Sequence, residues 1–355
     1  MHPRPEVWQL APAPHGGHPP AAERPVLDFS TNTNPLGPSP RVLAAVRAAT
    51  VDRYPEPASA TLRDALAARL GLAPERIVVG NGSVELLWLL ALAYLERGDR
   101  VVVCGPTFAE YARAARLMGA QVTVVSAAAE AGFRPDLDAL RRTVTALAPR
   151  VTFLCNPNNP TGVYLDRSAV EAVLAATPGL LVVDEAYVGF VEQPWDIGPL
   201  LADERLVVLR SLTKDHALPG LRLGYALAAP PVAAALHRVQ PPWSVNALAQ
   251  AAGLAALEDD AHVARGRALA ARARVLLATG LEALRLPALP SATNFLLVEV
   301  GDAAATTAAW LSAGVYVRDC TSFGLPRHVR IAARPLAECR VLLRAARAWH
   351  ARRSA

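Results

Sequence analysis

The sequence contains almost no lysine. Lysine and arginine together account for 36 of the 355 residues, and Lys214 is the one lysine among them. Arginine can serve in most surface and ion-pair positions, but its guanidinium stays protonated and cannot attack a carbonyl carbon, as a deprotonated lysine amine can. Composition leaves two interpretations open: Lys214 is a surface residue retained by chance, or it is needed for the reactivity of its amine. The residues around Lys214 therefore have to decide between them.

Long hydrophobic runs are also missing. The longest uninterrupted apolar stretch covers residues 86–95, whereas a helix that spans a bilayer needs about 20 such residues. The first 22 residues are rich in proline, histidine and glycine and lack the basic, apolar and small-residue order of a secretory signal. We therefore expect no membrane association and a cytoplasmic location.

Cysteines are few and widely separated. The chain has four, and no two of them form a CxxC pair: Cys104, Cys155, Cys320 and Cys339. Zinc sites and disulfide frameworks use closely spaced cysteines, so neither is supported here. We expect reduced cysteines in the core and no metal site.

The chain has a modest excess of positive charge without a concentrated basic segment. Its formal net charge is +5, and its arginines are scattered singly except over residues 347–353. A solvated helix face explains that cluster more simply than a nucleic-acid site does, so we expect no nucleic-acid partner. A modest positive field suits a small anionic substrate.

Strand-like and helix-like segments alternate through the first two thirds of the chain. Short apolar strands separated by helices are typical of a largely parallel sheet that is covered by helices on both faces. Such sheets bind ligands at the carboxyl ends of their strands. The expected strands cover residues 77–79, 101–104, 122–126, 151–155, 180–183 and 206–210, with helices beginning near Ser83, Phe108, Asp136 and Asp166.

The last third reads as a second, smaller α/β unit. Residues 241–280 are helical in pattern, and strand-like segments alternate with helices beyond them, with strands at 294–300, 316–318 and 329–332. We predict an N-terminal arm over residues 1–27, a large domain over 28–245, and a linking helix with a small C-terminal domain over 246–355. As an alternative, residues 28–50 pack against the small domain rather than against the large one.

The segment around the unique lysine carries the strongest chemical signal. Ser211 and Thr213 precede Lys214 closely, and Arg222 follows eight residues later. Hydroxyls and a guanidinium are the charge-assisted donors that a dianionic phosphate requires. A nearby cation and partial burial would lower the pKa of the lysine amine, which must be neutral to form a Schiff base.

Three further segments lie at expected strand ends. The loop 80–85 follows a strand and opens a helix, so the backbone N–H groups of Gly82, Ser83 and Val84 suit a phosphate; a plain helix cap at Ser83 is the alternative.

Asp184 ends an apolar strand, where a carboxylate is costly to bury unless it meets a cation such as a protonated pyridine nitrogen. A cap of the following turn explains Asp184 equally well. In the rigid loop 156–162, which contains two prolines, Asn159 would hydrogen-bond the 3-oxygen of such a ring, as would Tyr187; turn formation alone also explains that loop.

Together these segments resemble the fold-type I pyridoxal-phosphate enzymes, the class I/II aminotransferase superfamily. The resemblance covers residues 15–345 and implies an α/β fold with a mostly parallel sheet between helices and a smaller C-terminal α/β domain. It also implies a homodimer with active sites at the subunit interface. The sequence motifs that carry the resemblance are Asp28-Phe-Ser, Asn34-Pro-Leu-Gly, Arg53-Tyr-Pro, Asn158-Asn-Pro-Thr-Gly, Asp184-Glu-Ala-Tyr, Ser211-Leu-Thr-Lys and Gly220-Leu-Arg-Leu-Gly-Tyr.

The resemblance also assigns roles to residues. It implies that Lys214 is the catalytic residue and binds pyridoxal 5'-phosphate as a Schiff base, while Asp184 pairs with the pyridinium nitrogen. Tyr54 would reach the cofactor of the other subunit. Further cofactor contacts would be Gly82, Ser83, Val84, Phe108, Asn159, Tyr187, Ser211, Thr213 and Arg222, and substrate contacts would be His15, Asn34, Arg330 and Arg334.

Two branches of the superfamily are closest, L-threonine-O-3-phosphate decarboxylase of cobalamin biosynthesis and histidinol-phosphate aminotransferase. Three segments are similar to the decarboxylase branch: the N-terminal arm with His15-Gly-Gly, the segment around Lys214, and residues 242–246. Arg334 lies four residues past Arg330, so both would point to one face of a strand and bind a substrate with two anionic groups. We therefore expect the decarboxylase, with histidinol-phosphate or a related aminotransferase as the alternative.

Other features leave the reaction open. Asp215 and His216 follow the lysine where both branches usually carry an aromatic or small residue, so an altered substrate is conceivable. Which bond breaks depends on the bond held perpendicular to the cofactor ring, and sequence does not set that angle. A non-catalytic cofactor-binding module is a third reading, but the segment before Asp28 is too short for a DNA-binding domain.

Overall fold

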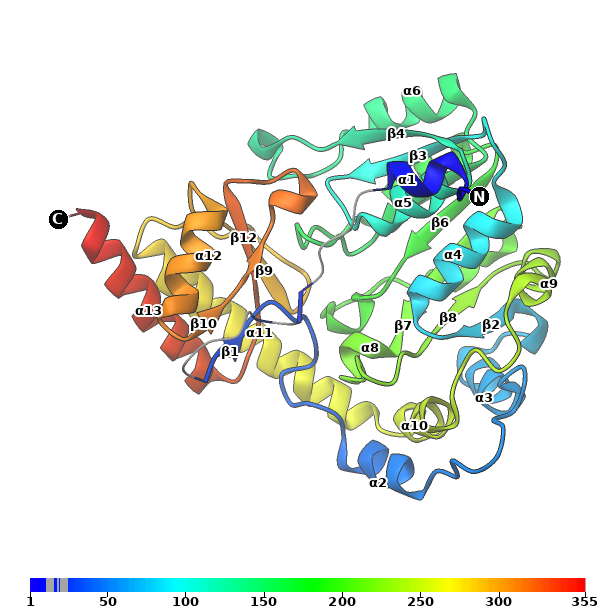
Figure 1. Ribbon diagram of the computed structural model, residues 1–355, viewed down its shortest axis with the longest axis horizontal. Coiled ribbons are helices and arrows are strands. Elements are labelled where there is room, and N and C mark those ends of the chain that lie inside the picture. The colour runs from blue at the N-terminus through cyan, green and yellow to red at the C-terminus, as the bar shows by residue number, and fades with distance from the viewer. Residues whose placement is uncertain (11–15, 18, 20–24, 355) are drawn as a thin grey trace.

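The computed structural model describes residues 1–10, 16, 17, 19 and 25–354 (Figure 1). His15, one of the expected substrate contacts, lies outside these ranges. Within them, no helix has both the length and the apolar character needed to cross a membrane.

A seven-stranded sheet forms the centre of the larger unit. Its order is β2-β8-β7-β6-β5-β3-β4, and all neighbouring strands are parallel except at β8, which is antiparallel to both β2 and β7. The expected strands match, but β8 was missed because it is a short segment beginning with glycine. The bounds are β2 Ile77–Gly80, β3 Arg100–Gly105, β4 Gln121–Ser126, β5 Val151–Cys155, β6 Leu180–Asp184, β7 Leu206–Ser211 and β8 Gly224–Leu227.

Helices cover both faces of this sheet, because successive strand residues point to opposite sides. Val182 packs in the cluster formed with α4 Ser83–Tyr94, α5 Glu110–Leu117 and α9 Pro230–Val239. Its neighbour Val183 packs in the opposite cluster. That second cluster contains residues of α2 Pro40–Ala48, α3 Ala60–Leu70, α6 Leu137–Leu147, α7 Arg167–Ala176 and α10 Ala247–Leu257.

A smaller unit follows in the chain and contains a three-stranded antiparallel sheet of order β11-β12-β9. The helix α11 Asp260–Glu282 (yellow in Figure 1) runs from α10 into this unit. Its other elements are β9 Phe295–Glu299, α12 Ala303–Ser312, β11 Arg318–Asp319, β12 His328–Ala332 and α13 Leu336–Ser354. The mostly parallel sheet between helices and the smaller second unit confirm the predicted fold class.

The N-terminal segment contacts both units. The strand β1 Leu27–Asp28 pairs in parallel with β10 Val315–Tyr316 of the smaller unit, whereas α2 packs on α10. The short helix α1 Pro5–Gln9 lies against α5. We keep the division at 245/246, with its arm over residues 1–27, as a proposal.

Short helical turns complete the chain. Four of them are 3-10 turns in the larger unit and one lies in the smaller unit, while α8 carries the unique lysine. They are η1 Pro74–Arg76, η2 Ala129–Ala131, η3 Val188–Phe190, η4 Gly198–Ala202, α8 Leu212–Asp215 and η5 Thr321–Phe323.

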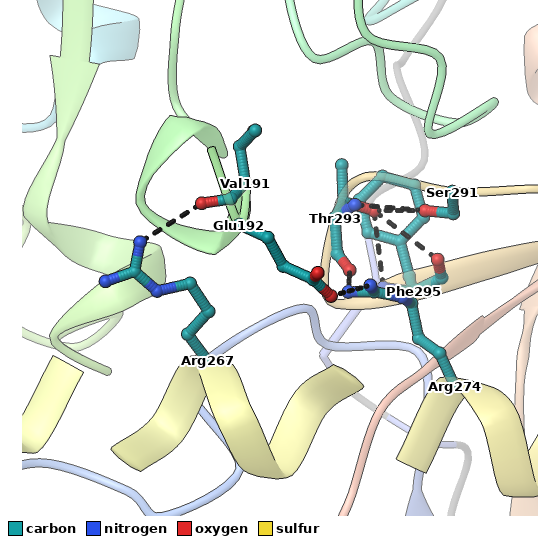
Figure 2. Close-up of polar contacts among 7 residues, drawn as sticks. All are labelled: Val191, Glu192, Arg267, Arg274, Ser291, Thr293 and Phe295. Carbon is teal, nitrogen blue, oxygen red and sulfur yellow. Dashed lines mark hydrogen bonds and ion pairs between the residues drawn. The ribbon is translucent and has the colours of Figure 1, made fainter. Parts of the chain in front are cut away.

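Two arginines of α11 join the segment after η3 to the start of the smaller sheet (Figure 2). Arg267 donates to the Val191 carbonyl at 3.1 Å. Arg274 donates to the Thr293 carbonyl and forms an ion pair with Glu192 at 3.6 Å. The long helix is therefore bonded to the larger unit and to the strand entry of the smaller one.

Candidate active site

A cavity of about 860 Å³ lies where the carboxyl ends of the central strands meet the smaller unit. Cys155, Asp184 and Ser211 line it at the ends of β5, β6 and β7. The start of α4 and the turn before α5 add a second wall, and two arginines of the smaller sheet add a third. Of the residues expected from sequence, the cavity wall contains Ser83, Val84, Phe108, Asn159, Asp184, Tyr187, Ser211, Thr213, Lys214, Arg222 and Arg330.

Lys214 lies on the four-residue helix α8, directly after β7. The Ser211 hydroxyl caps this helix by accepting from the Thr213 N–H at 3.2 Å. The lysine Nζ lies 5.8 Å from the centre of the Tyr187 ring. Burial, followed by the charges of Arg330 and Arg222, lowers the pKa of Lys214 to about 8. Part of the amine population is therefore neutral near that pH and able to attack a carbonyl.

Asp184 is the last residue of β6 and is buried. Its Oδ2 accepts from the Tyr111 hydroxyl at 2.7 Å, and its Oδ1 accepts from the Ala186 N–H at 3.0 Å. Burial raises the pKa of this carboxyl, and these two hydrogen bonds oppose the increase. A cation placed beside Asp184 would be stabilised, as a ring nitrogen that carries a proton requires. Tyr111 was missed in the sequence, although it lies three residues after Phe108.

One end of the cavity is suited to a phosphate. The twelve-residue helix α4 begins there, and its N-cap, Gly82, provides no side-chain cap. A Cβ on Gly82 would lie 2.6 Å from a terminal nitrogen of Arg222, so glycine allows the guanidinium to approach the helix start. The Gly82 N–H, expected from sequence as a phosphate donor, instead donates to the Gly80 carbonyl at 2.7 Å. The first N–H groups of α4, at Ser83 and Val84, lack intrahelical acceptors, and with a guanidinium and the buried hydroxyls of Ser211 and Thr213 they suit a dianion.

The other end carries two arginines from adjacent strands. Arg330 of β12 pairs with Arg318 of β11 in the strand register, and both line the cavity. Arg330 donates to the Ser30 carbonyl at 2.8 Å and to the Asn159 side chain, while its Nε has no hydrogen-bond partner among the described residues. Burial lowers the pKa of its guanidinium. This end is therefore suited to an anion.

Arg318 was missed in the sequence and Arg334 was expected in its place. The strand β12 ends at Ala332, so the argument that Arg330 and Arg334 share one strand face does not apply. Arg334 instead donates to Glu338 of α13 at 2.8 Å and does not line the cavity. The expected strand 316–318 is split into two strands with different partners, which is why the facing position of Arg318 was not visible.

Three other expected residues lie outside the cavity wall. Gly82 lies against Arg222, as described above. Asn34 is buried behind the lysine, where its side chain bonds to the backbone of Asp215. Tyr54 is 81% exposed and stacks on Trp243 with ring centres 4.6 Å apart. A reach of Tyr54 to another subunit stays a prediction.

The remaining expected residues lie around the cavity centre. Phe108 contacts Tyr111 edge to face at 5.7 Å, and the Tyr187 hydroxyl accepts from the Asn32 amide at 3.3 Å. Cys155 also lines the cavity, and burial raises the pKa of its thiol to about 12, so the thiol stays protonated at neutral pH. An amine, a buried carboxylate, an aromatic ring and a dianion site fit pyridoxal phosphate well.

Comparison with known proteins gives the family. The model for aminotransferases of class I and II matches residues 24–345. The chain belongs to the class I and II aminotransferases. It is therefore an enzyme that uses pyridoxal phosphate, as the sequence predicted, and the reading as a non-catalytic module is wrong.

Several relatives of this aminotransferase carry the same description. The histidinol-phosphate aminotransferase of Symbiobacterium thermophilum is 45% identical over 86% of this chain and 85% of the relative. That of Sphingopyxis alaskensis is 40% identical over 98% of this chain and 97% of the relative. The histidinol-phosphate aminotransferase of Sinorhizobium meliloti, solved in complex with pyridoxal-5'-phosphate, is 28% identical with a TM-score of 0.85, covering 97% of each chain.

These relatives overturn the expected decarboxylase. The relatives described above are named aminotransferases, as is the one from Anaeromyxobacter at 41% identity, and the alternative reading is the one they support. The structure also places Arg334 against Glu338 rather than in the cavity, so it does not provide the second arginine expected for the decarboxylase. The expectation of a phosphothreonine decarboxylase, with its link to cobalamin biosynthesis, was wrong.

Proposed function

We propose that this aminotransferase transfers the amino group of histidinol phosphate to a keto acid such as 2-oxoglutarate. The observation that carries the proposal is the order of charges along the cavity. Arg222 and Arg330 both lie close enough to Lys214 to lower its pKa, and Arg318 is the strand partner of Arg330. The lysine therefore has a cationic side chain toward each end of the cavity.

The two ends support different anions. The Arg222 end, with the start of α4, would hold the cofactor phosphate through Ser83, Val84, Ser211 and Thr213, while Gly82 leaves room for the Arg222 guanidinium. The Arg330 end would then hold the substrate's anionic group. Two guanidiniums can bind a dianionic phosphate in several charge-assisted hydrogen bonds, and they can also bind the carboxylate of a keto acid. One site can therefore alternate between an amino donor with a phosphate and a keto-acid acceptor.

The chain's own residues supply the proton chemistry. Pyridoxal phosphate, when bound, supplies an aldehyde that condenses with amines and a ring that withdraws electrons from the adjacent carbon. The Lys214 amine, neutral in part near pH 8, would take the proton from the carbon that bears the substrate amine. Asp184, oriented by Tyr111, would hold a proton on the ring nitrogen. Asn159 and Tyr187 would hold the ring oxygen, and Phe108 would contact the ring face.

We further propose a homodimer in which the exposed Tyr54 of one subunit contacts the cofactor site of the other. Exposure of a large aromatic pair, Tyr54 and Trp243, supports a subunit contact at this surface. The cytoplasmic location predicted from sequence stays a prediction.

The first test measures substrate preference in the enzyme loaded with pyridoxal phosphate. Formation of glutamate from 2-oxoglutarate is followed with histidinol phosphate, histidinol or aspartate as amino donor. Aspartate is included because aspartate aminotransferases of Thermus thermophilus share the fold, one with a TM-score of 0.83 at 29% identity over 92% of this chain and 91% of that chain. We expect kcat/KM for histidinol phosphate to exceed that for either competitor by about 100-fold or more, because an unfilled arginine site is costly.

The matched variant for this test is Arg318→Met, which keeps most of the side-chain volume and removes the charge. We expect kcat/KM for histidinol phosphate to fall about 10- to 100-fold, mainly through KM, as for the loss of a charged hydrogen bond. Arg334→Met serves as the control, because Arg334 bonds to Glu338 away from the cavity. Faster transfer from aspartate, or equal effects of both variants, would refute the proposed substrate.

A further inference from the structure

Asn34 lies behind the lysine and contacts the turn that carries it. Its backbone N–H donates to the Lys214 carbonyl at 2.8 Å, and its side-chain Nδ2 donates to the Asp215 carbonyl at 2.9 Å. Its Oδ1 accepts from the Leu36 N–H at 3.0 Å. The residue is 1% exposed. One asparagine therefore bonds to two consecutive carbonyls of α8.

The helix α8 depends on such outside partners. It has four residues, Leu212–Asp215, and the last four carbonyls of any helix lack partners from later helical turns. A helix this short is also unstable by itself, because the conformational entropy lost in forming its first turn exceeds the stabilisation from the hydrogen bonds of that turn. The Lys214 carbonyl also accepts from the Ala217 N–H at 3.4 Å, and the two donors of Asn34 add the shorter bonds to the carbonyls of the last two residues. The direction in which Lys214 leaves the backbone is thus set in part by Asn34.

Asn34 is held from its other side by α11. A Cβ on Gly266 would lie 2.1, 2.2 and 2.4 Å from the side-chain nitrogen, oxygen and carbon of the Asn34 amide. Glycine at this position leaves just enough room for the amide between α11 and the lysine turn. The Asn34 side chain can therefore hardly move while the helix stays in place.

The same segment reaches the substrate end of the cavity. The Thr33 carbonyl accepts from the Asn294 amide at 3.0 Å, and the Ser30 carbonyl accepts from Arg330. Residues 30–34 thus run from the arginine of the smaller unit to the lysine turn of the larger one. Positions of Arg330 and Lys214 are linked through a short, buried piece of backbone.

We propose that Asn34 is a positioning residue that clamps the turn carrying Lys214 and so holds its amine inside the cavity. This differs from the substrate contact that the sequence predicted for Asn34. The proposal rests on Lys214 as the amine of the proposed function, but it does not depend on which amino donor is used.

A loosened clamp has a measurable consequence. With the turn free, the Lys214 amine would reach solvent, and its pKa would rise from about 8 toward the ordinary value of 10.5. Because the cation is then favoured, less neutral amine is present at neutral pH. A purely structural role of Asn34 would change the folding equilibrium without moving this titration.

Two substitutions disturb the clamp from opposite sides. Asn34→Leu keeps a similar size and adds no charge, but it removes the donor that faces the Asp215 carbonyl. Gly266→Ala leaves Asn34 unchanged and forces its amide aside. The matched control is Gly280→Ala in the same helix, where the new Cβ would meet only side-chain carbons of Leu343, at 2.6 Å or more.

The readout uses the single lysine and needs neither cofactor nor substrate. The apoenzyme is labelled with acetic anhydride across a pH series, and the Lys214 peptide is quantified by mass spectrometry, with the terminal amine resolved as a separate peptide. We expect half-titration near pH 8 in the wild type and in Gly280→Ala. In Asn34→Leu and Gly266→Ala we expect the midpoint to rise by about one unit or more, which lowers the neutral fraction at pH 7 about tenfold.

A second readout is the split of kinetic constants in the loaded enzyme. We expect kcat to fall about tenfold or more in both clamp variants while KM changes less than about threefold, since the arginine end is intact. Unchanged titration midpoints in both folded variants would overturn the proposal, as would an equal shift in Gly280→Ala. If Asn34→Leu does not fold, Gly266→Ala decides the question. Failure of histidinol phosphate as a substrate would leave the titration result standing.

Discussion

Lys214 is buried close to two cationic side chains, Arg222 and Arg330, and to the carboxylate of Asp184. In the apoenzyme this surrounding disfavours the ammonium form, and burial disfavours it further. The arrangement is suited to an amine that must be neutral to react. It also means that the free enzyme is destabilised at neutral pH by the residue on which its chemistry depends.

This destabilisation gives a prediction for the apoenzyme variant Lys214→Met. The pKa of Lys214 is about 8 in the folded chain and 10.5 as its ordinary value, so between these values the unfolded chain binds more protons and wild-type stability rises with pH. Below about pH 8 both states are protonated and the penalty is complete. We expect Lys214→Met to be more stable than wild type at pH 7 by about 3 kcal/mol, with the difference shrinking toward pH 10.5.

Urea unfolding of both apoenzymes at several pH values measures this difference. Lys214→Arg is the control, because a guanidinium keeps its charge and should remain destabilising throughout the range. A stability difference that does not change with pH would contradict the assigned shift.

At the scale of elements, the start of α4 and the residue Arg222 act together. Both Gly82 and Arg222 have left-handed backbone conformations, with φ of 79° and 61°. The first is a glycine, for which this conformation carries little strain, whereas the second is a non-glycine residue held there by its surroundings. The two conformations bring a guanidinium to the helix terminus, where an anion is favoured.

Gly82→Ala tests this element. The new Cβ would lie 2.6 Å from Arg222, so we expect the guanidinium to be displaced and the dissociation constant of pyridoxal phosphate to rise about tenfold or more. Gly301→Ala is the control, since Gly301 has a similar φ of 82° with no atom within 4 Å of its Cβ position. Equilibrium titration of the apoenzyme by absorbance measures both, and an equal loss of affinity in the control would show that the contact with Arg222 is not responsible.

At the scale of the whole molecule, α11 connects the two units through Arg267 and Arg274 (Figure 2). Arg274 is mostly buried, and burial lowers the pKa of its guanidinium while Glu192 opposes the change. Its partner Glu192 is 68% exposed. The buried bond to the Thr293 carbonyl should therefore contribute more to stability than the exposed ion pair does.

Arg274→Met and Glu192→Gln separate these two contributions. We expect Arg274→Met to lower the free energy of unfolding by about 1–3 kcal/mol, because it leaves a buried carbonyl without its donor. Glu192→Gln should cost less than about 1 kcal/mol, as is usual for an exposed pair. Urea unfolding of the holoenzyme compares them, and a larger loss for Glu192→Gln would reverse our assignment.

The proposed homodimer is tested by mixing two inactive variants. If Tyr54 of one subunit completes the site that contains Lys214 of the other, mixed dimers of Tyr54→Ala and Lys214→Ala regain one intact site. Statistical exchange should then restore about a quarter of wild-type activity. No gain on mixing, with dimers verified by sedimentation, would place Tyr54 outside the neighbouring site.

Much of the large unit could be predicted from the chain itself. Short continuous apolar strands and the helices between them are local properties, and they placed Lys214, Asp184 and the loop before α4 at strand ends that meet at one sheet edge. The unique lysine, together with the hydroxyls and the arginine near it in the chain, indicates amine chemistry from the sequence alone. The family and its cofactor followed from these segments.

The partners of individual side chains were decided only by the tertiary structure. Arg334 was expected in the site because it follows Arg330 by four residues, but the strand ends before it, and Arg318 from the neighbouring strand lies there instead. Tyr111 and Asn34 acquire their roles from contacts 73 and 181 residues away in the chain. Local periodicity determines which residues share a face, whereas strand ends, register and packing determine which atoms meet, and these depend on the whole fold.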